Sequence, residues 1–306
     1  MTKVIFGLRP ADAVTILFLL FLSVLTMIFY KNVPKAPTLM SIYLILIVSQ
    51  IIIIRFKNRN NFLSLFYNVI FPTICVLVIF DSLGDLVHFV NPEDKDLALI
   101  RIDYLIFHGH PTVMLEKIMS PLLTDLLQLA YSTYYFIPLI FGVTLFLSNQ
   151  RGEFDRTLFL ILFCFYLSYL GYILIPAIGP RFTINHLQTT ELQGLFIAEP
   201  IQRLLNQLEG IKRDAFPSGH TAIPLVVLYL ANRFKRRLFW IFLPVVSALI
   251  FSTVYCRYHY VVDVIGGFGL AIITIFLGER YYEWWLKGQQ RSKIIEKVSV
   301  YSLDKR

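Results

Sequence analysis

Two short stretches in the last third of the chain carry residues whose types and spacing could support chemistry. The stretches AFPSGHTA (215–222) and STVYCRYHYVVDVIGG (252–267) each place one histidine, His220 or His259, beside an apolar run. Histidine inside or at the edge of a membrane segment is costly and uncommon, so two of them indicate a functional site. Asp263 follows His259 by four residues and therefore lies on the same face of a helix. There a carboxylate can fix one ring nitrogen and leave the other free as a nucleophile or base.

The composition indicates an integral membrane protein. Of the 306 residues, 57% are hydrophobic and 15% aromatic, and the mean hydropathy is +0.65, which is too apolar for a soluble domain of this length. The net charge of +8 is divided among short clusters between apolar runs. This pattern favours a positive-inside topology over nucleic-acid binding. Cys75, Cys164 and Cys256 all lie within apolar runs and indicate neither a disulfide framework nor a thiolate metal site.

Eight apolar runs predict an all-α, polytopic membrane protein with about eight transmembrane helices. They cover residues 12–30, 38–54, 62–83, 124–147, 157–176, 218–232, 238–256 and 260–278. The first run ends without a small-residue cleavage pattern and is interpreted as an uncleaved anchor. The sixth run is short and would reach only about 22 Å as a helix. We therefore expect its PSGH end to lie below the outer lipid surface, where a lipid headgroup could enter sideways.

The basic clusters predict the orientation in the membrane. A cytoplasmic N-terminus places the clusters at 55–59, 151–156, 233–237 and 280–297 in the cytoplasm, whereas the opposite orientation would translocate all of them. Both termini are therefore expected to be cytoplasmic. The candidate site then lies on the non-cytoplasmic side. Because the chain shows no evident retention signal, we expect the membrane to be a bacterial inner membrane.

Three regions are expected along the chain. Residues 1–61 form an N-terminal two-helix membrane extension, 62–279 a catalytic membrane domain, and 280–306 a loose, basic cytoplasmic tail. The outer loops of the catalytic domain, 84–123 and 177–216, each contain a segment with amphipathic spacing. Such segments could lie on the membrane surface and wall off the site.

The outer ends of the predicted helices favour binding of an anion. The sixth and eighth helices both begin on the outer side, so their positive dipole ends point at the same place. Ser218 and Gly219 suit a tight helix entrance, since glycine lets the backbone approach an oxyanion and serine can donate its hydroxyl proton. Arg181 and Arg257, also on the outer side, can hold phosphate oxygens. These residues predict a phosphate pocket that needs no metal ion.

Other polar residues give weaker signals. Asp81, Asp85 and His88 share one helical face at the outer end of the third run and could bind the headgroup of an acceptor lipid. Ordinary helix capping or loop polarity is the alternative interpretation of the three. His108 and His110 lack a defined third ligand, so they do not indicate a metal site.

Taken with IGPRFT (178–183), the two histidine stretches resemble the type 2 phosphatidic acid phosphatase (PAP2) superfamily. The PSGH element of that superfamily is complete at 217–220, and its H-x3-D element is complete at His259 and Asp263. The serine that opens the third element is present as Ser252. The resemblance is strong over residues 170–267 and implies a PAP2-like helical bundle core.

The sequence departs from the superfamily pattern at three places. Thr253 stands where arginine is usual, Leu174 where lysine is expected, and Pro180 precedes Arg181 instead of following it. These departures, with the phrase ST-x-Y-x3-HY-x2-D, look more like the branch that contains inositol phosphorylceramide synthase, the aureobasidin-sensitive enzyme, and its bacterial relatives.

The resemblance implies roles for the site residues and requires no cofactor. His259 would attack phosphorus and form a phosphohistidine, and Asp263 would hold the far nitrogen of its ring. His220 would protonate the departing alcohol and then deprotonate the acceptor. Because Thr253 replaces the usual arginine, Arg257 is proposed to take over its role. Lys212 and Arg213, just before PSGH, are the competing candidates.

The expected function is a lipid phosphotransferase or phosphatase that acts on a phospholipid or sphingolipid in the bilayer. Water as acceptor would make it a lipid phosphate phosphatase, acting on phosphatidic acid or a polyprenyl diphosphate. A lipid hydroxyl as acceptor would make it a transferase resembling inositol phosphorylceramide synthase. A transporter with a His/Asp proton relay and a scaffold with a degenerate site are the alternatives from other classes.

Overall fold

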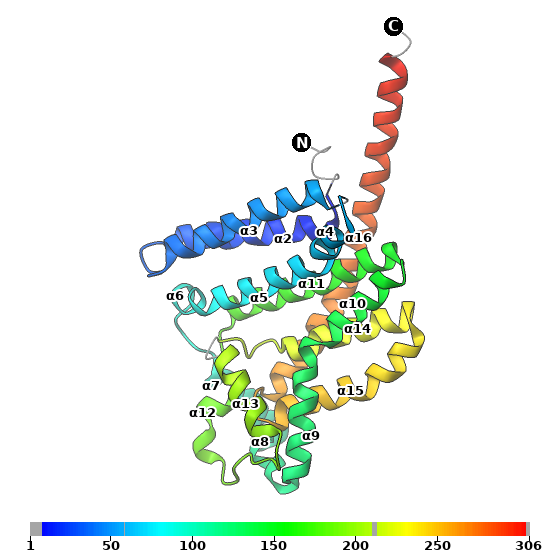
Figure 1. Cartoon of the computed structure of the whole chain (residues 1–306). Coiled ribbons are helices and arrows are strands. Elements are labelled where there is room, and N and C mark those ends of the chain that lie inside the picture. Colours follow the sequence, from blue (N-terminus) through cyan, green and yellow to red (C-terminus); the bar gives the residue numbers. More distant parts are fainter. Residues whose placement is uncertain (1–7, 58, 210–212, 304–306) are drawn as a thin grey trace.

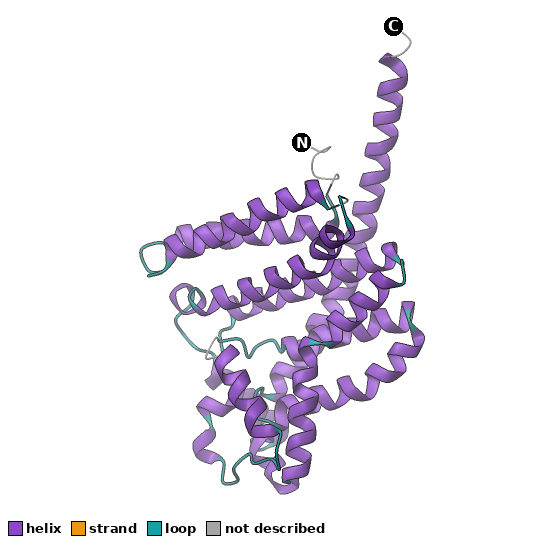
Figure 2. Ribbon diagram, in the orientation of Figure 1, coloured by secondary structure: helices purple, strands orange, loops and turns teal. Residues whose placement is uncertain are grey.

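The computed structural model describes residues 8–57, 59–209 and 213–303, and within these ranges the chain is helical with no β-strand (Figure 2). The prediction of an all-α membrane protein is confirmed. Six helices are long and apolar enough to cross a bilayer. They are α2 (Pro10–Ile28), α3 (Ala36–Phe56), the continuous stretch α4, η1 and α5 (Asn61–Leu65, Phe66–Ile70, Phe71–Gly84), α11 (Arg151–Leu174), α15 (Arg236–Tyr255) and α16 (Val261–Leu303).

The other two apolar runs are also helical, but neither is a straight span. The run predicted at 124–147 becomes α9 (Pro121–Ser132), η3 (Thr133–Tyr135) and α10 (Ile137–Leu147), bent by 47° at the break. Pro138 lies in the first turn of α10, where its missing N–H is tolerated. The sixth run becomes α14 (Gly219–Phe234), whose 16 residues reach about 24 Å. The eight apolar runs thus become six helices long enough to span a membrane, one bent pair and the short helix α14.

The segments predicted to lie outside fold into short helices, most of which lie beside α9 (Figure 1). The first segment supplies α6 (Val87–Val90), α7 (Asp96–Phe107), α8 (Pro111–Met114) and η2 (Leu115–Ile118), and the second supplies α12 (Pro180–Thr183), η4 (Asn185–Leu187) and α13 (Ala198–Glu209). Asp125 ties the second segment to α9, because its carboxylate accepts hydrogen bonds from the four backbone N–H groups of residues 195–198. This carboxylate satisfies N–H groups at the start of α13 that have no partner within the helix.

The N-terminal helix packs into the same core as the rest of the bundle. Phe18 of α2 stacks on Tyr166 of α11 with 4.7 Å between ring centroids, and the hydroxyls of Thr15 and Tyr166 lie 2.9 Å apart. At the other end of the bundle α14 packs against α11, α15 and α16. The domain boundary at residue 61 stays a prediction.

The C-terminal region differs from the loose tail that we predicted. α16 continues as one helix to Leu303 (Figure 1). Arg156 of α11 pairs with Glu279 and Glu283, and Trp285 donates its indole N–H to the carbonyl of Leu8 at 3.2 Å. The sequence beyond them contains no proline and is rich in Lys, Arg and Gln. These residues favour a helix, so charge alone is a poor guide to disorder here.

Candidate active site

Three loops at the same end of the bundle meet and are held together by backbone hydrogen bonds. They follow α11 (residues 175–179), precede α14 (213–218) and connect α15 to α16 (256–260). Ala215 donates its N–H to the carbonyl of Ala177 at 3.0 Å. Arg181, just after the first loop, donates its N–H to the carbonyl of Arg257 at 3.1 Å. The close spacing of the loops brings together residues from three separate motifs.

The contacts of His259 identify which ring nitrogen carries its proton. Nδ1 lies 2.8 Å from the carbonyl oxygen of Ala215, and a carbonyl can only accept, so Nδ1 is the protonated nitrogen. Oδ2 of Asp263 is more distant from Nδ1, at 3.4 Å, and accepts the N–H of Tyr260 at 2.9 Å. The nitrogen Nε2 keeps its lone pair and lies 3.5 Å from Nδ1 of His220.

His220 is held between two aromatic rings. Tyr131 stacks on it with a centroid distance of 4.4 Å, and Tyr134 lies 4.0 Å away on the bent α9–α10 segment. Tyr258 in turn stacks on Tyr131 at 4.1 Å. These rings restrict where the imidazole can lie. Nothing in the sequence around His220 pointed to them, because they come from a segment almost ninety residues earlier.

Arg181 lies beside the histidine pair. Its guanidinium carbon is 4.9 Å from the centre of the Tyr258 ring, and its positive charge disfavours protonation of His259. Gly179 has a φ of 89°, which is a glycine conformation. A side chain there would meet the carbonyl oxygen of Tyr258 at 2.7 Å. The glycine before Pro180 therefore lets this loop approach the loop that carries His259.

Burial and nearby charges set the proton affinity of His259, which lies between α15 and α16 and outside both spans. Burial lowers its pKa to about 4, against opposing effects of the Asp214 charge and the Ala215 hydrogen bond. The ring is therefore neutral at physiological pH. A neutral imidazole with a free Nε2 lone pair is the form that can act as a nucleophile.

We expected the Arg257 side chain to contact phosphate, but in the structure it has other partners. Its guanidinium donates to Glu116 at 3.0 Å and to the carbonyl of Thr190 at 2.5 Å, and the side chain is mostly buried. No hydrogen bond joins it to either histidine among the described residues. Arg213 pairs with Asp94 at 2.6 Å, and Lys212 lies outside the described residues. Arg181 is thus the arginine that the structure brings to the histidines.

Thr253, which occupies the position where arginine is usual, is fully buried in α15. Its hydroxyl donates to the carbonyl of Ile250 at 2.7 Å. Its own carbonyl accepts the N–H groups of Tyr258 and His259 at 2.9 and 3.0 Å. The backbone of Thr253 therefore positions the histidine loop, although its side chain carries no charge.

Ser218 and Gly219 form the start of α14, as expected, and are fully buried. The N–H of Ser218 donates to the carbonyl of Asp263 at 3.0 Å. A side chain at Gly219 would meet the hydroxyl of Tyr172 at 2.7 Å, so close packing requires glycine there. The start of the eighth helix, which we expected to face a bound anion, is capped by a carboxylate of the protein. Val261 and Val262 donate their N–H groups to Asp103, at 2.9 and 2.8 Å.

The candidate acceptor residues lie apart from this constellation. Asp85 forms an ion pair with Lys35 at 3.0 Å, which joins the end of α5 to the α2–α3 connection. His88 is exposed on α6 and packs edge-on against Phe89, and Asp81 is exposed. Among the described residues, no hydrogen bond joins any of the three to His220 or His259. Their role as an acceptor site stays a prediction without structural support.

Sequence reasoning missed two carboxylates on α7. Asp96 accepts the N–H groups of Ile178 and Gly179, each at 2.9 Å, and the hydroxyl of Tyr260 at 2.8 Å. Asp103 caps α16, as described above. The two are seven residues apart and therefore share one face of α7. The spacing was visible in the sequence, and the structure buries both carboxylates, with Leu99, on one face of α7.

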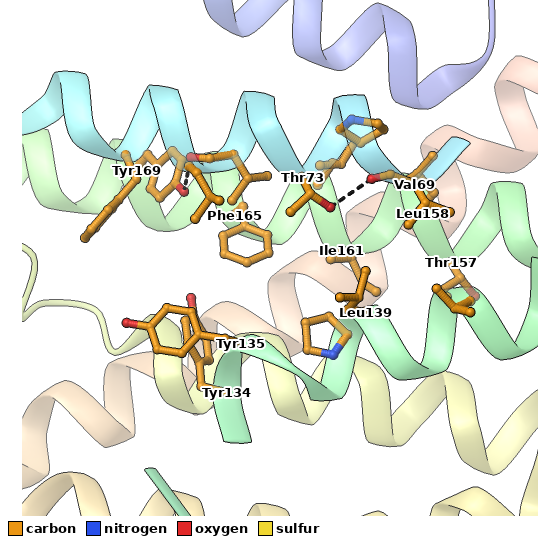
Figure 3. A pocket seen from close by; sticks show the side chains of 18 of the residues that line it. Val69, Thr73, Tyr134, Tyr135, Leu139, Thr157, Leu158, Ile161, Phe165 and Tyr169 are labelled. Atoms are coloured by element: carbon orange, nitrogen blue, oxygen red, sulfur yellow. Dashed lines mark hydrogen bonds between the residues drawn. The ribbon is translucent and has the colours of Figure 1, made fainter. Parts of the chain in front are cut away.

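A long apolar groove leads away from His220 between α5, α10 and α11 (Figure 3). Its volume is about 160 Å³, roughly ten times what one water molecule needs. Tyr134 and Tyr135 lie at one end and Thr157 at the other, while Phe165 projects between them (Figure 3). Asp214, just before the PSGH motif, lines the groove near His220. Neither the groove nor Asp214 was expected from the sequence.

Comparison with known proteins gives one family and one curated relative. A model of the PAP2 superfamily matches residues 97–277. Phosphoinositol dihydroceramide synthase of Bacteroides thetaiotaomicron is 29% identical over 163 residues, which cover 49% of this chain and 52% of the relative. The match thus covers about half the length of each protein. No solved structure gives a significant match.

Proposed function

Because the chain belongs to the PAP2 superfamily, we propose that it is a membrane-embedded lipid phosphotransferase with a phosphohistidine intermediate at His259. The resemblance to a protein named phosphoinositol dihydroceramide synthase supports transfer of a phosphorylated headgroup to a ceramide-like alcohol. The observation that carries the mechanism is the pairing of the rings. The Nδ1 proton of His259 is engaged by Ala215, and the free Nε2 faces His220 at 3.5 Å.

In the first half-reaction, Nε2 of His259 attacks phosphorus and the bond between phosphorus and the lipid alcohol oxygen breaks. That oxygen takes a proton from His220, so the alcohol leaves neutral. Arg181 lies close enough to balance charge on the phosphoryl oxygens. The Ala215 carbonyl and Asp263 face the Nδ1–H of the imidazolium ring that carries the phosphoryl group.

In the second half-reaction, the oxygen of the acceptor attacks phosphorus and the bond from phosphorus to Nε2 breaks. The acceptor proton passes to His220, which restores both histidines to their starting states. A lipid hydroxyl as acceptor gives transfer, and water gives hydrolysis. Because a phosphoryl group must come between the two rings, we expect the His220–His259 contact to open when substrate binds.

The test uses purified protein in mixed micelles containing EDTA, with phosphatidylinositol as donor and ceramide present or absent. We expect ceramide-dependent formation of a new inositol phospholipid with little release of water-soluble phosphate. His259→Ala and His220→Ala should each lower turnover by several orders of magnitude. Rapid quenching with radiolabelled donor should trap an acid-labile phosphoenzyme in the wild type and none in His259→Ala.

The same assay separates the alternatives. Phosphate release that needs no acceptor would make the protein a phosphatase. Wild-type rates in both histidine variants would overturn the histidine mechanism and favour the relay or scaffold interpretation.

A further inference from the structure

We propose that the groove between α5, α10 and α11 binds the N-acyl chain of a ceramide-like acceptor lipid and presents the acceptor hydroxyl to His220. This inference rests on the proposed function and adds the position and chemistry of the acceptor. The groove contains His220, the residue that takes the acceptor proton. A chain lying in it would deliver a hydroxyl to that base without displacing the residues around His259.

The length of the groove suits a long extended chain. On α11 the lining runs from Phe154 to Tyr172. This separation of 18 residues corresponds to about 27 Å along the helix axis. The hydrocarbon core of a bilayer is about 30 Å thick, so the groove follows nearly the whole depth of the membrane. Its walls are mainly Leu, Ile, Val, Phe and Pro side chains, with Asn68, Thr73 and Thr157 as polar exceptions away from His220. Most of the length therefore suits methylene groups.

The groove is open to the bilayer on one side. Leu77 of α5 and Leu139 of α10 both line it and are 52% and 39% exposed. In a membrane-spanning protein, such exposed apolar side chains face hydrocarbon. The 47° bend between η3 and α10 lies beside this opening, and a lipid chain can therefore enter laterally without crossing a polar surface.

The charge of the polar end favours an uncharged alcohol over a phospholipid donor. The described lining includes the hydroxyl-bearing Tyr134 and Tyr172 and the carboxylate-bearing Asp214, but no Lys or Arg. An anionic phosphate at this end would meet a carboxylate, and the described lining residues offer it no cation. The donor phosphate is better placed at His259, where Arg181 lies nearby. A neutral hydroxylic headgroup can instead hydrogen-bond to the tyrosines and the carboxylate.

The groove selects by shape, because the bilayer is as apolar as the groove and gives no hydrophobic driving force between them. Gly142 therefore provides a direct test. An added Cβ there would meet only the edge of the Phe154 ring, at 3.9 Å, so a larger side chain fits the helix and fills the deep end. Gly269 of α16 is a matched control, since an added Cβ there meets nothing within 4 Å and the residue does not line the groove.

The experiment compares wild type, Gly142→Leu and Gly269→Leu with ceramides of 6-carbon and 18-carbon acyl chains at fixed donor. We expect Gly142→Leu to lower transfer to the long acceptor by about tenfold, to leave the short acceptor near the wild-type rate, and Gly269→Leu to match wild type for both. A second series varies the acyl chains of the phosphatidylinositol donor at fixed ceramide. If the defect of Gly142→Leu follows the donor chain and not the acceptor chain, the assignment of the groove to the acceptor is wrong. Equal transfer rates for both ceramides in all three proteins would show that the groove binds no lipid chain during the reaction.

A second measurement does not depend on turnover or on the folding of a variant. A long-chain ceramide with a diazirine at its chain end is photolysed on the wild-type protein, and the labelled peptides are identified. Labelling at 138–143 and 154–161 is expected, and labelling confined to other helices contradicts the proposal. If wild type transfers no headgroup but is labelled there, the proposed reaction fails while the lipid site stands.

Discussion

At the scale of the residue, the proton on His259 matters most. Its Nδ1–H is donated to the Ala215 carbonyl at 2.8 Å, whereas Asp263 is 3.4 Å away. The i, i+4 spacing of His259 and Asp263 suggested that the carboxylate would be the closer partner. A backbone carbonyl from the loop before α14 takes that place, and Asp263 divides its role between the ring and the N–H of Tyr260.

The lowered pKa of His259 predicts an unusual acid limb in the pH profile. The nucleophile is the unprotonated ring, which predominates above its pKa of about 4 instead of above the ordinary 6.5. We therefore expect kcat/KM to stay level as pH falls from about 6.5 to 5 and to decline only near pH 4. The profile is measured with phosphatidylinositol and ceramide, and each sample is returned to pH 7 to exclude unfolding. If kcat/KM instead falls to half its maximum near pH 6.5, burial does not lower the pKa of His259.

At the scale of the element, α7 acts as a clamp on the catalytic loops. It was expected to lie on the membrane surface as an amphipathic wall, and it does expose Leu97, Leu105 and Ile106. Its buried face, however, directs Asp96 to the loop after α11 and Asp103 to the start of α16. One short helix thereby holds two of the three loops that carry the site.

Asp103→Ala should therefore affect both stability and activity. Loss of the cap leaves two buried N–H groups without a partner, and we expect a cost of about 1–2 kcal/mol with a lower thermal midpoint by tryptophan fluorescence in micelles. Activity should fall as well, because Val261 follows His259 by two residues. Asp103→Asn keeps one acceptor oxygen and should be intermediate, and Leu97→Ala on the exposed face of α7 should match wild type. An unchanged midpoint in Asp103→Ala would rule out the clamp.

At the scale of the whole molecule, the arrangement separates where the two substrates enter. Arg181 lies on α12, among the short helices beside α9 (Figure 1), and His259 lies in the connection between α15 and α16. The groove instead opens sideways toward lipid, between Leu77 and Leu139. Such a division lets a polar headgroup and a hydrocarbon chain reach the histidine pair from different directions.

The predicted orientation can be tested by labelling single cysteines. The natural residues Cys75, Cys164 and Cys256 are all buried, so background labelling should be low. With a membrane-impermeant maleimide on spheroplasts, Glu191→Cys in the outer segment should react before lysis. Arg237→Cys at the basic start of α15 should react only after the membrane is permeabilised. The reverse pattern would place the histidine site in the cytoplasm.

Several features of this protein could be determined from its sequence alone. The length of each apolar run is a local property, and so the sequence predicted helices at all eight runs and the shortness of the PSGH helix. The motifs at 217–220 and 259–263 likewise indicated the superfamily, because residue type and spacing within one helix turn are visible in the chain. The 47° break at 136 was not expected, since Pro138 alone does not specify how far the chain bends.

Only the tertiary structure decided which residues surround those motifs. Arg257 was expected to contact phosphate because Thr253 replaces the usual arginine and because Arg257 lies on the predicted outer side, but its guanidinium donates to Glu116, 141 residues away. The Tyr131 and Tyr134 rings, the Asp103 cap and the groove also arise between segments that are far apart in sequence. Periodicity reports which face of a helix is apolar, whereas partners across the bundle depend on how the helices pack, and that is settled only when the whole chain has folded.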